Sequence, residues 1–272
     1  MSAIRNVGMV GLGKMGLPMA KHLLAKGFQV AGCDPVEACR AAARSAGVTI
    51  VDSPRAAAKV SDLVIVVVGF DHEVETAVTS IVEGARKGLI VALASTVAPR
   101  YATRLAQRLA DSELILLDIP LARGEAAAVA GKLLIYGAGD EKAFEACRPV
   151  FAAFASDVFH LGAAGAGQVG KMVNNLILWA CISVNDEGLR LGEALGIDPA
   201  KLKEALSHGS AQNWAMDTMA ERSGMPWAEK DMSIVLHEAD LARLSLPLAG
   251  TVKEVIKGLK IRLGLGLPHG SE

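Results

Sequence analysis

The sequence predicts an α/β protein with an N-terminal Rossmann doubly wound sheet and a C-terminal all-α domain, joined by a long interdomain helix. Three observations support this fold class. Short apolar segments alternate with helical ones in the first half, a glycine-rich loop separates the first strand from the first helix, and the pattern beyond residue 196 is helical throughout. We therefore expect two domains, over residues 1–162 and 163–272.

The strands of the first half are short, apolar and bounded by turn residues, and the segments between them have a helical period. Helices are expected from residue 17, after Ser53-Pro54, over 71–83, from Pro99 and over 141–155. Strands separated by helices of this length indicate βαβ units and a mainly parallel sheet. The expected strands are 7–10, 28–33, 48–51, 62–68, 89–93, 114–117, 133–136 and 157–160.

The second half reads as helices. The first runs without a breaker over 162–195, and the others are expected over 199–206, 215–220, 230–243 and 248–263. A long helix with apolar residues on several sides is expected where two domains meet.

Composition excludes several classes of protein. The 28 basic and 29 acidic residues nearly cancel, and the aromatic content is 4%, so the sequence does not suggest a nucleic-acid-binding protein. The apolar runs are too short for a membrane span, and we see no export signal, so we expect a cytoplasmic protein. The four cysteines and six histidines show no metal-ligand spacing, and no metal site is expected.

The glycine-rich loop has the GxGxxG spacing of a dinucleotide-binding turn. Gly11 permits the tight turn, Gly13 lets the backbone approach a pyrophosphate, and Gly16 lets helix and strand pack closely. The start of the following helix offers amide donors to the phosphates. The alternative is a glycine-rich turn without a ligand. The expected cofactor-binding residues here are Gly11, Leu12, Gly13, Lys14, Met15 and Gly16.

Asp34 ends the second expected strand, eighteen residues after Gly16. A carboxylate at this place can accept hydrogen bonds from the adenosine ribose, and it would repel the 2′-phosphate of NADP. Pro35 follows it, where an arginine could have held such a phosphate. NAD is therefore favoured over NADP, although Arg40 and Arg44 on the next helix leave NADP open. The alternative role for Asp34 is a turn or cap residue.

The long helix carries a polar stripe. Lys171 and Asn175 are four residues apart on one face, Asn174 lies beside them, and Gln168 is one turn earlier. Burial would lower the pKa of a lysine here towards neutrality, where it can act as a general acid or base. The alternative is that Lys171 extends to solvent from the helix start and the asparagines satisfy loop backbone groups.

Five motifs in order resemble the β-hydroxyacid dehydrogenases, a family that includes 3-hydroxyisobutyrate dehydrogenase, tartronate semialdehyde reductase and sulfolactaldehyde reductase. The resemblance covers almost the whole chain. The motifs are the glycine-rich loop 11–16, Ser95-Thr96, residues 118–124, residues 165–175 and Lys230-Asp231.

The resemblance implies roles for individual residues. Lys171 matches the family's catalytic lysine and Asn175 its substrate-orienting asparagine, with Asn174 beside it. Thr96 matches a residue near both nicotinamide and substrate, and Lys230 matches a lysine that reaches the cofactor. Val68, at the end of its strand, is also expected at the cofactor, because ligands of such sheets bind at the carboxyl ends of strands.

One departure from the family concerns the substrate. Ala122-Arg123-Gly124 stands where the family usually has Ser-Gly-Gly, so a guanidinium replaces a hydroxyl. Arg123 could bind a carboxylate or sulfonate in a bidentate way, and the sulfolactaldehyde reductases similarly have an arginine here. Alternatively, Arg123 faces solvent or Asp118.

We therefore expect an oxidoreductase that transfers a hydride between NAD(H) and a small, anionic 3-hydroxy acid or its semialdehyde, working as a homodimer or homotetramer. The alternatives are an imine reductase or sugar-phosphate dehydrogenase of the same fold, or a non-catalytic NAD-binding sensor.

Overall fold

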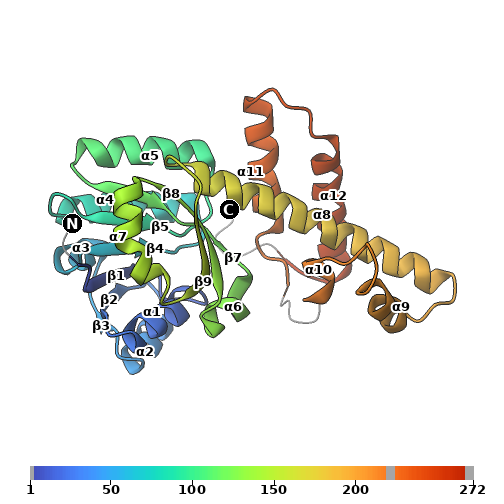
Figure 1. Cartoon of the computed structure of the whole chain (residues 1–272), viewed down its shortest axis with the longest axis horizontal. Coiled ribbons are helices and arrows are strands. Elements are labelled where there is room, and N and C mark those ends of the chain that lie inside the picture. The colour runs from blue at the N-terminus through green and yellow to red at the C-terminus, as the bar shows by residue number, and fades with distance from the viewer. Residues whose placement is uncertain (1–2, 219–223, 267–272) are drawn as a thin grey trace. The chain divides into compact units, whose positions relative to one another are not determined.

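The computed structural model describes residues 3–218 and 224–266. The chain divides into two compact units, Met1–Lys171 and Met172–Glu272. Figure 1 shows their elements in chain order from blue to red.

The N-terminal unit is built on a sheet with the strand order β3-β2-β1-β4-β5-β6-β8-β7, and β9 pairs with β8. The chain leaves β1 towards β2 and β3 on one side and returns to β4, β5 and β6 on the other, so the direction of winding reverses between β1 and β4. This reversal creates the place where open α/β sheets bind ligands. The strands are β1 (Asn6–Val10), β2 (Gln29–Cys33), β3 (Thr49–Ile50), β4 (Leu63–Val66), β5 (Ile90–Leu93), β6 (Ile115–Asp118), β7 (Leu121–Ala122), β8 (Leu133–Gly139) and β9 (Ala155–His160).

Helices cover both faces of this sheet because its central strands are apolar on both sides. In β4, Leu63 and Ile65 join one buried cluster and Val64 and Val66 join the other, as the two-residue period of a strand requires. One face is covered by α1 (Gly16–Ala25), α2 (Glu37–Ser45), α6 (Gly124–Ala130) and α7 (Glu141–Phe151). The other is covered by α3 (Pro54–Val60), α4 (Asp71–Gly84) and α5 (Pro99–Asp111), and Figure 1 shows α5 and α1 on opposite sides of the sheet.

The sheet departs from expectation after β6. The strands from β1 to β6 pair in parallel as predicted, but β8 runs antiparallel to β6 and to the unpredicted two-residue strand β7. The short helix α6 was also not predicted. Its alanine-rich sequence begins at a glycine and carries no regular apolar stripe, so periodicity alone does not mark it.

Several expected boundaries are also wrong. Strand β4 ends at Val66 because the next residues turn towards α4, and α7 ends at Phe151 because β9 already begins at Ala155. Of the helix expected over 215–220, the structure has α10 (Trp214–Asp217), and residues 219 and 220 lie outside the described residues.

Helix α8 (Ala166–Ala194) belongs to both units, and the second unit continues with α9 (Pro199–Leu206), α10, α11 (Ala228–Leu241) and α12 (Pro247–Arg262). The core of this unit joins α8, α11 and α12 through buried residues such as Trp179, Met232 and Ile256. The indole nitrogen of Trp179 donates a hydrogen bond of 3.0 Å to the Asp231 carboxylate, which fixes α11 against α8. None of the helices among the described residues is long and apolar enough to cross a bilayer.

Candidate active site

The glycine-rich loop lies where the ends of β1 and β4 meet. Gly11 has a φ of 96°, which favours glycine, and a Cβ on it would lie 2.3 Å from the carbonyl oxygen of Val67. A Cβ on Gly16 would lie 2.0 Å from the carbonyl oxygen of Gly11. Side chains at these two positions would therefore push the loop away from the sheet.

Gly13 differs from its two neighbours. Apart from Gly13 itself and its two neighbours in sequence, no described residue has a heavy atom within 4 Å of the position that its Cβ would take. Helix α1 begins three residues later, and among the described residues no side chain caps its first turn and no acidic residue lies in it. Open space beside uncapped helix amides fits the pyrophosphate of a dinucleotide.

The side chain of Lys14 extends from the same loop. It is 78% exposed, and its Nζ lies 3.6 Å from a carboxylate oxygen of Glu125 on α6. An exposed ion pair of this kind contributes little to stability and can open for a ligand.

Asp34 directly follows β2 and is half-buried. Its Oδ2 accepts a hydrogen bond of 2.7 Å from the backbone N–H of Leu12, and its Oδ1 accepts one of 2.8 Å from the N–H of Val36. The carboxylate therefore ties the glycine-rich loop to the start of α2. A carboxylate has about four lone-pair sites, so two remain for the hydroxyls of a ribose.

The ends of β4 and β5 are joined by Ser95. Its hydroxyl accepts a hydrogen bond of 2.8 Å from the N–H of Val68, and Val68 in turn lies next to Gly11, since a Cβ on that glycine would be 3.4 Å from its Cγ1. Thr96 follows Ser95 and is half-buried. Val68 and Thr96 thus lie on the edge of the sheet that carries the glycine-rich loop.

Gln168 links this edge to helix α8. Its side-chain amide donates to the carbonyl oxygen of Ser95 at 3.0 Å, and its Oε1 accepts from the N–H of Val97 at 3.1 Å. Gln168 is 1% exposed, so both bonds are shielded from water. They set the position of Lys171, one turn further along α8, relative to the end of β5.

Asp118 binds the backbone at the start of α8. Its two carboxylate oxygens accept from the backbone N–H groups of Gly165 at 3.1 Å and Gln168 at 3.0 Å. Burial raises the pKa of this carboxyl, and the bonds from the amides oppose that rise. A Cβ on Gly167 would lie 2.8 Å from Asp118 Oδ2, so only glycine lets the helix approach so closely.

Lys171, Asn174 and Asn175 lie within the next turn of α8. Lys171 and Asn174 are half-buried and Asn175 is 3% exposed. The Nδ2 of Asn174 donates to the Oδ1 of Asn175 at 3.0 Å. One face of a single helix therefore carries the amine and both amides.

The guanidinium of Arg123 is bound by Ser156 and Asp157 on β9 rather than by Asp118, one of the two alternatives given above. Its Nη1 donates to Asp157 Oδ2 at 2.6 Å, to the Ser156 hydroxyl at 2.9 Å and to the carbonyl oxygen of Lys132 at 3.2 Å. The Ser156 hydrogen bond and then Arg123 lower the pKa of the Asp157 carboxyl. All three bonds use one nitrogen of a guanidinium whose side chain is 35% exposed.

Lys230 lies on α11 in the second unit. It is half-buried, and its Nζ is 5.9 Å from the centroid of the Trp227 ring. The next residue is Asp231, the partner of Trp179, so the Lys230-Asp231 pair occurs where α11 is fastened to α8.

Sequence reasoning missed the anchoring residues. The sequence pattern placed Gln168 on the polar stripe of α8 without a partner, and it gave Asp118 only as the start of a motif and as an alternative partner of Arg123. An aspartate that ends a buried strand is a signal that can be read, but its partners are 47 and 50 residues away in the sequence. The described residues contain no group of three or more His, Cys, Asp or Glu side chains able to hold a metal ion.

Two family models match the chain. Residues 6–162 match the NAD-binding domain of 6-phosphogluconate dehydrogenase, and residues 165–266 match the model described as the NAD-binding domain of NADP-dependent 3-hydroxyisobutyrate dehydrogenase. L-threonate dehydrogenase from Cupriavidus necator is 32% identical over 266 residues, which cover 92% of this chain and 89% of that protein. The chain belongs to the β-hydroxyacid dehydrogenase family.

Further relatives agree with this assignment. The NAD-dependent L-serine dehydrogenase of Pseudomonas aeruginosa is 33% identical over 217 residues, 79% of this chain and 73% of that protein. The structure of Mycobacterium tuberculosis 3-hydroxyisobutyrate dehydrogenase with L-serine superposes with a TM-score of 0.86 at 26% identity, covering 95% of this chain and 94% of the other. The glycine-rich loop lies within the part of the chain that matches the model of an NAD-binding domain.

Proposed function

We propose that this protein oxidises a small 3-hydroxy acid with NAD, or reduces the corresponding semialdehyde with NADH. The observation that carries the proposal is the position of Lys171. Gln168 and Asp118 fix the turn of α8 that precedes this lysine to the sheet edge that holds the dinucleotide loop. Relatives named for the oxidation of L-threonate and L-serine, both small hydroxy acids, support the substrate class.

Lys171 is proposed to move the proton of the reaction. NAD(H), once bound, would supply the hydride chemistry. During oxidation the neutral amine of Lys171 accepts the proton of the substrate hydroxyl, and during reduction the ammonium returns it to the oxygen of the carbonyl. Asn175 and Asn174 would orient the substrate from the same helix face, and Thr96 would contact it from the end of β5.

NAD is proposed as the preferred cofactor. Asp34 already uses two lone pairs on backbone amides, and its remaining lone pairs suit two ribose hydroxyls. The same carboxylate would repel a 2′-phosphate. The glycine-rich loop, Val68 and Lys230 complete the proposed cofactor contacts.

Arg123 is proposed to bind the acidic group of the substrate, a carboxylate or a sulfonate. Asp157 holds its Nη1, so an anion would share the guanidinium through its other donors or displace that carboxylate.

We further propose that residues 1–162 form the NAD-binding domain and residues 163–272 the domain for substrate binding and oligomerisation. Exposed apolar residues at seven-residue spacing on α8 support subunit contacts, because such residues lie on one face of a helix. They are Ile177, Val184 and Leu191, with 58%, 61% and 62% of their surface exposed. Light scattering on the purified protein should give a dimer or tetramer, and a monomer would contradict this proposal.

The test of the proposed function is NADH formation with a panel of 3-hydroxy acids, each measured with NAD and with NADP. The panel spans monocarboxylates, dicarboxylates and sulfonates. We expect turnover with NAD on one headgroup class above the others. If no acid of the panel gives NADH formation while NADH still binds, the dehydrogenase function is contradicted and a sensor or an imine reductase is favoured.

A pair of variants tests the role of Arg123. Arg123→Ala should raise the KM for the preferred anion by about tenfold, through loss of a charge-assisted pair, with kcat nearly unchanged. Asp157→Asn releases the guanidinium and should lower the same KM. If neither variant changes KM, Arg123 does not bind the substrate.

A further inference from the structure

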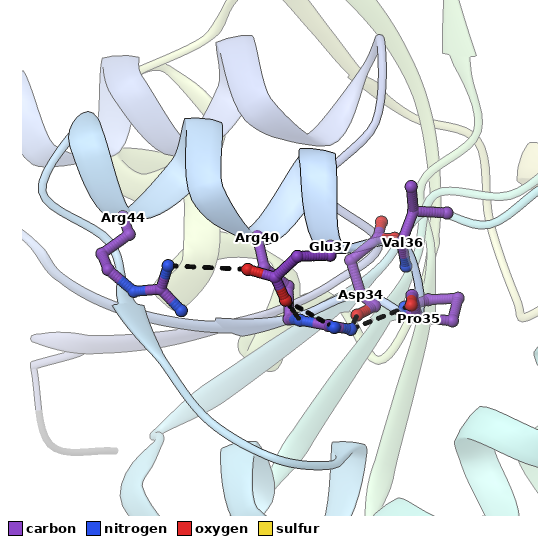
Figure 2. Close-up of polar contacts among 6 residues, drawn as sticks. All are labelled: Asp34, Pro35, Val36, Glu37, Arg40 and Arg44. Atoms are coloured by element: carbon purple, nitrogen blue, oxygen red, sulfur yellow. Dashed lines mark hydrogen bonds and ion pairs between the residues drawn. The ribbon is translucent and has the colours of Figure 1, made fainter.

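Helix α2 begins three residues after Asp34 and carries two arginines on the side of the proposed ribose site. Arg40 is the nearer one, because its Nη1 donates to the carbonyl oxygen of Asp34 at 2.6 Å and to that of Pro35 at 2.9 Å. Figure 2 shows its guanidinium beneath the first turn of α2, joined by dashed lines to the backbone oxygens of Asp34 and Pro35. A cation at this place would suit the 2′-phosphate of NADP, and yet Asp34 and Pro35 fit NAD.

Glu37 occupies the edge of Arg40 that a phosphate would need. Its Oε2 lies 2.8 Å from Nε and 2.6 Å from Nη2 of Arg40. The Nε and Nη2 donors form one side of the planar guanidinium, and paired donors of this kind bind carboxylates and phosphates in a bidentate way. With Nη1 held by backbone oxygens, the remaining side of Arg40 faces Glu37.

The second arginine is held more loosely by the same carboxylate. Arg44 Nη1 lies 3.8 Å from Glu37 Oε1, one turn further along α2, as the dashed line in Figure 2 shows. One carboxylate thus lies between two guanidinium groups. Counted with Asp34, two negative and two positive charges balance at this end of α2.

We propose that Glu37 selects the cofactor: it occupies Arg40 and thereby keeps this protein from using NADP. The inference rests on the proposed use of NAD and adds a second residue to the selection. Asp34 acts by contact with the ribose and by repulsion of a phosphate. Glu37 acts on Arg40, so it is a positioning residue for that guanidinium.

The exposure of the pair makes the proposal testable. The Glu37 side chain is 65% exposed and that of Arg40 30% exposed, and exposed pairs on helix surfaces contribute little to folding. Glu37→Gln keeps the shape of the side chain and removes its charge. The net charge of the two acidic residues and two arginines then changes from zero to plus one. The Nε and Nη2 donors of Arg40 lose their charged partner.

The experiment is a calorimetric titration of the purified protein with NADPH and with NADH. It measures binding alone, so that no substrate or turnover is needed. In Glu37→Gln the Kd for NADPH should fall by about tenfold, the size of one charge-assisted pair at a partly exposed site. The Kd for NADH should change by less than about twofold, since NADH lacks the 2′-phosphate that the released guanidinium would bind. The increase in NADPH affinity caused by Glu37→Gln should become smaller as the salt concentration is raised from about 0.05 M to about 0.5 M.

Two control variants separate this effect from others. Glu145 and Arg148 on α7 form a pair of the same spacing, with Glu145 oxygens 2.7 Å from Nε and 2.6 Å from Nη2. Glu145→Gln therefore removes the same kind of charge elsewhere and should leave both Kd values unchanged. Combining Glu37→Gln with Arg40→Gln should abolish the gain for NADPH.

Three results would overturn the proposal. The first is an unchanged Kd for NADPH in Glu37→Gln while NADH binding is intact. The second is an equal increase in NADPH affinity in Glu145→Gln. The third is an increase in NADPH affinity that persists when Arg40 is replaced as well. If the unaltered protein fails to bind NADH, the proposed use of NAD fails as well, which distinguishes that failure from the failure of this inference.

Discussion

Asp34 and Asp118 stand at the ends of two strands of the same sheet, and each accepts hydrogen bonds from two backbone amides. Asp34 ties the glycine-rich loop to α2, and Asp118 ties the start of α8 to β6. Their surroundings differ. Asp34 is half-buried, whereas Asp118 is 0% exposed.

The difference shows how burial divides the roles of one residue type. A half-buried carboxylate keeps lone pairs that a ligand can reach, so Asp34 can both shape the loop and bind a ribose. Asp118 cannot be reached by a ligand, and burial raises the pKa of its carboxyl. Its role is to position the helix that carries Lys171. The two aspartates therefore support the proposed cofactor contacts and the proposed proton transfer, respectively.

The largest effect on stability is expected from Asp118→Ala. Removing the buried acceptor leaves the amides of Gly165 and Gln168 without their partner, so the free energy of unfolding should fall by about 2–4 kcal/mol. Urea unfolding of the variant and of Asp118→Asn, which keeps one acceptor oxygen, measures this. A variant as stable as the unaltered protein would show that Asp118 does not anchor α8.

A smaller effect on stability and a clear effect on binding are expected from Asp34→Ala. The Kd for NADH should rise by about tenfold or more, because a charge-assisted ribose contact and the tie to Leu12 are both lost. The Kd for NADPH should rise less, since a repulsion is removed too. An unchanged ratio of the two Kd values would assign cofactor preference to other groups.

The smallest effect concerns the neighbour of Asp34. Burial first, and the Asp34 carboxylate second, raise the pKa of the Cys33 thiol from 9.0 to about 11. Asp34→Asn removes the charge and leaves the burial, so the pKa should fall but stay above 9.0. The pH dependence of Cys33 alkylation, read by mass spectrometry, tests this. A pKa that does not move would show that the Asp34 charge does not reach the thiol.

Much of the fold could be predicted from the sequence because its signals are local. The glycine-rich loop, the alternation of strands and helices, and the long helix with Lys171 all lie in continuous stretches. The antiparallel pairing of β8 could not be predicted. Its partner β7 has only two residues, and the two strands pair only after the chain turns back through α6.

The candidate site was predictable only where each residue carries its own signal. Gly11, Asp34 and Lys171 each have a pattern around them. The partners of Gln168 and Arg123 lie far away in the sequence, and no pattern connects Arg123 with Asp157. Long-range hydrogen bonds of this kind depend on the folded sheet.

We propose that Lys171 moves the proton of a hydride-transfer reaction. Lys171→Ala and Lys171→Arg test it together, because arginine keeps the positive charge but does not lose its proton near neutral pH. Each variant is assayed for NADH binding and for NADH formation with the preferred hydroxy acid. If Lys171 has this role, both variants should bind NADH with nearly unaltered affinity and lose turnover by at least about a hundredfold. Turnover retained in Lys171→Ala would contradict it.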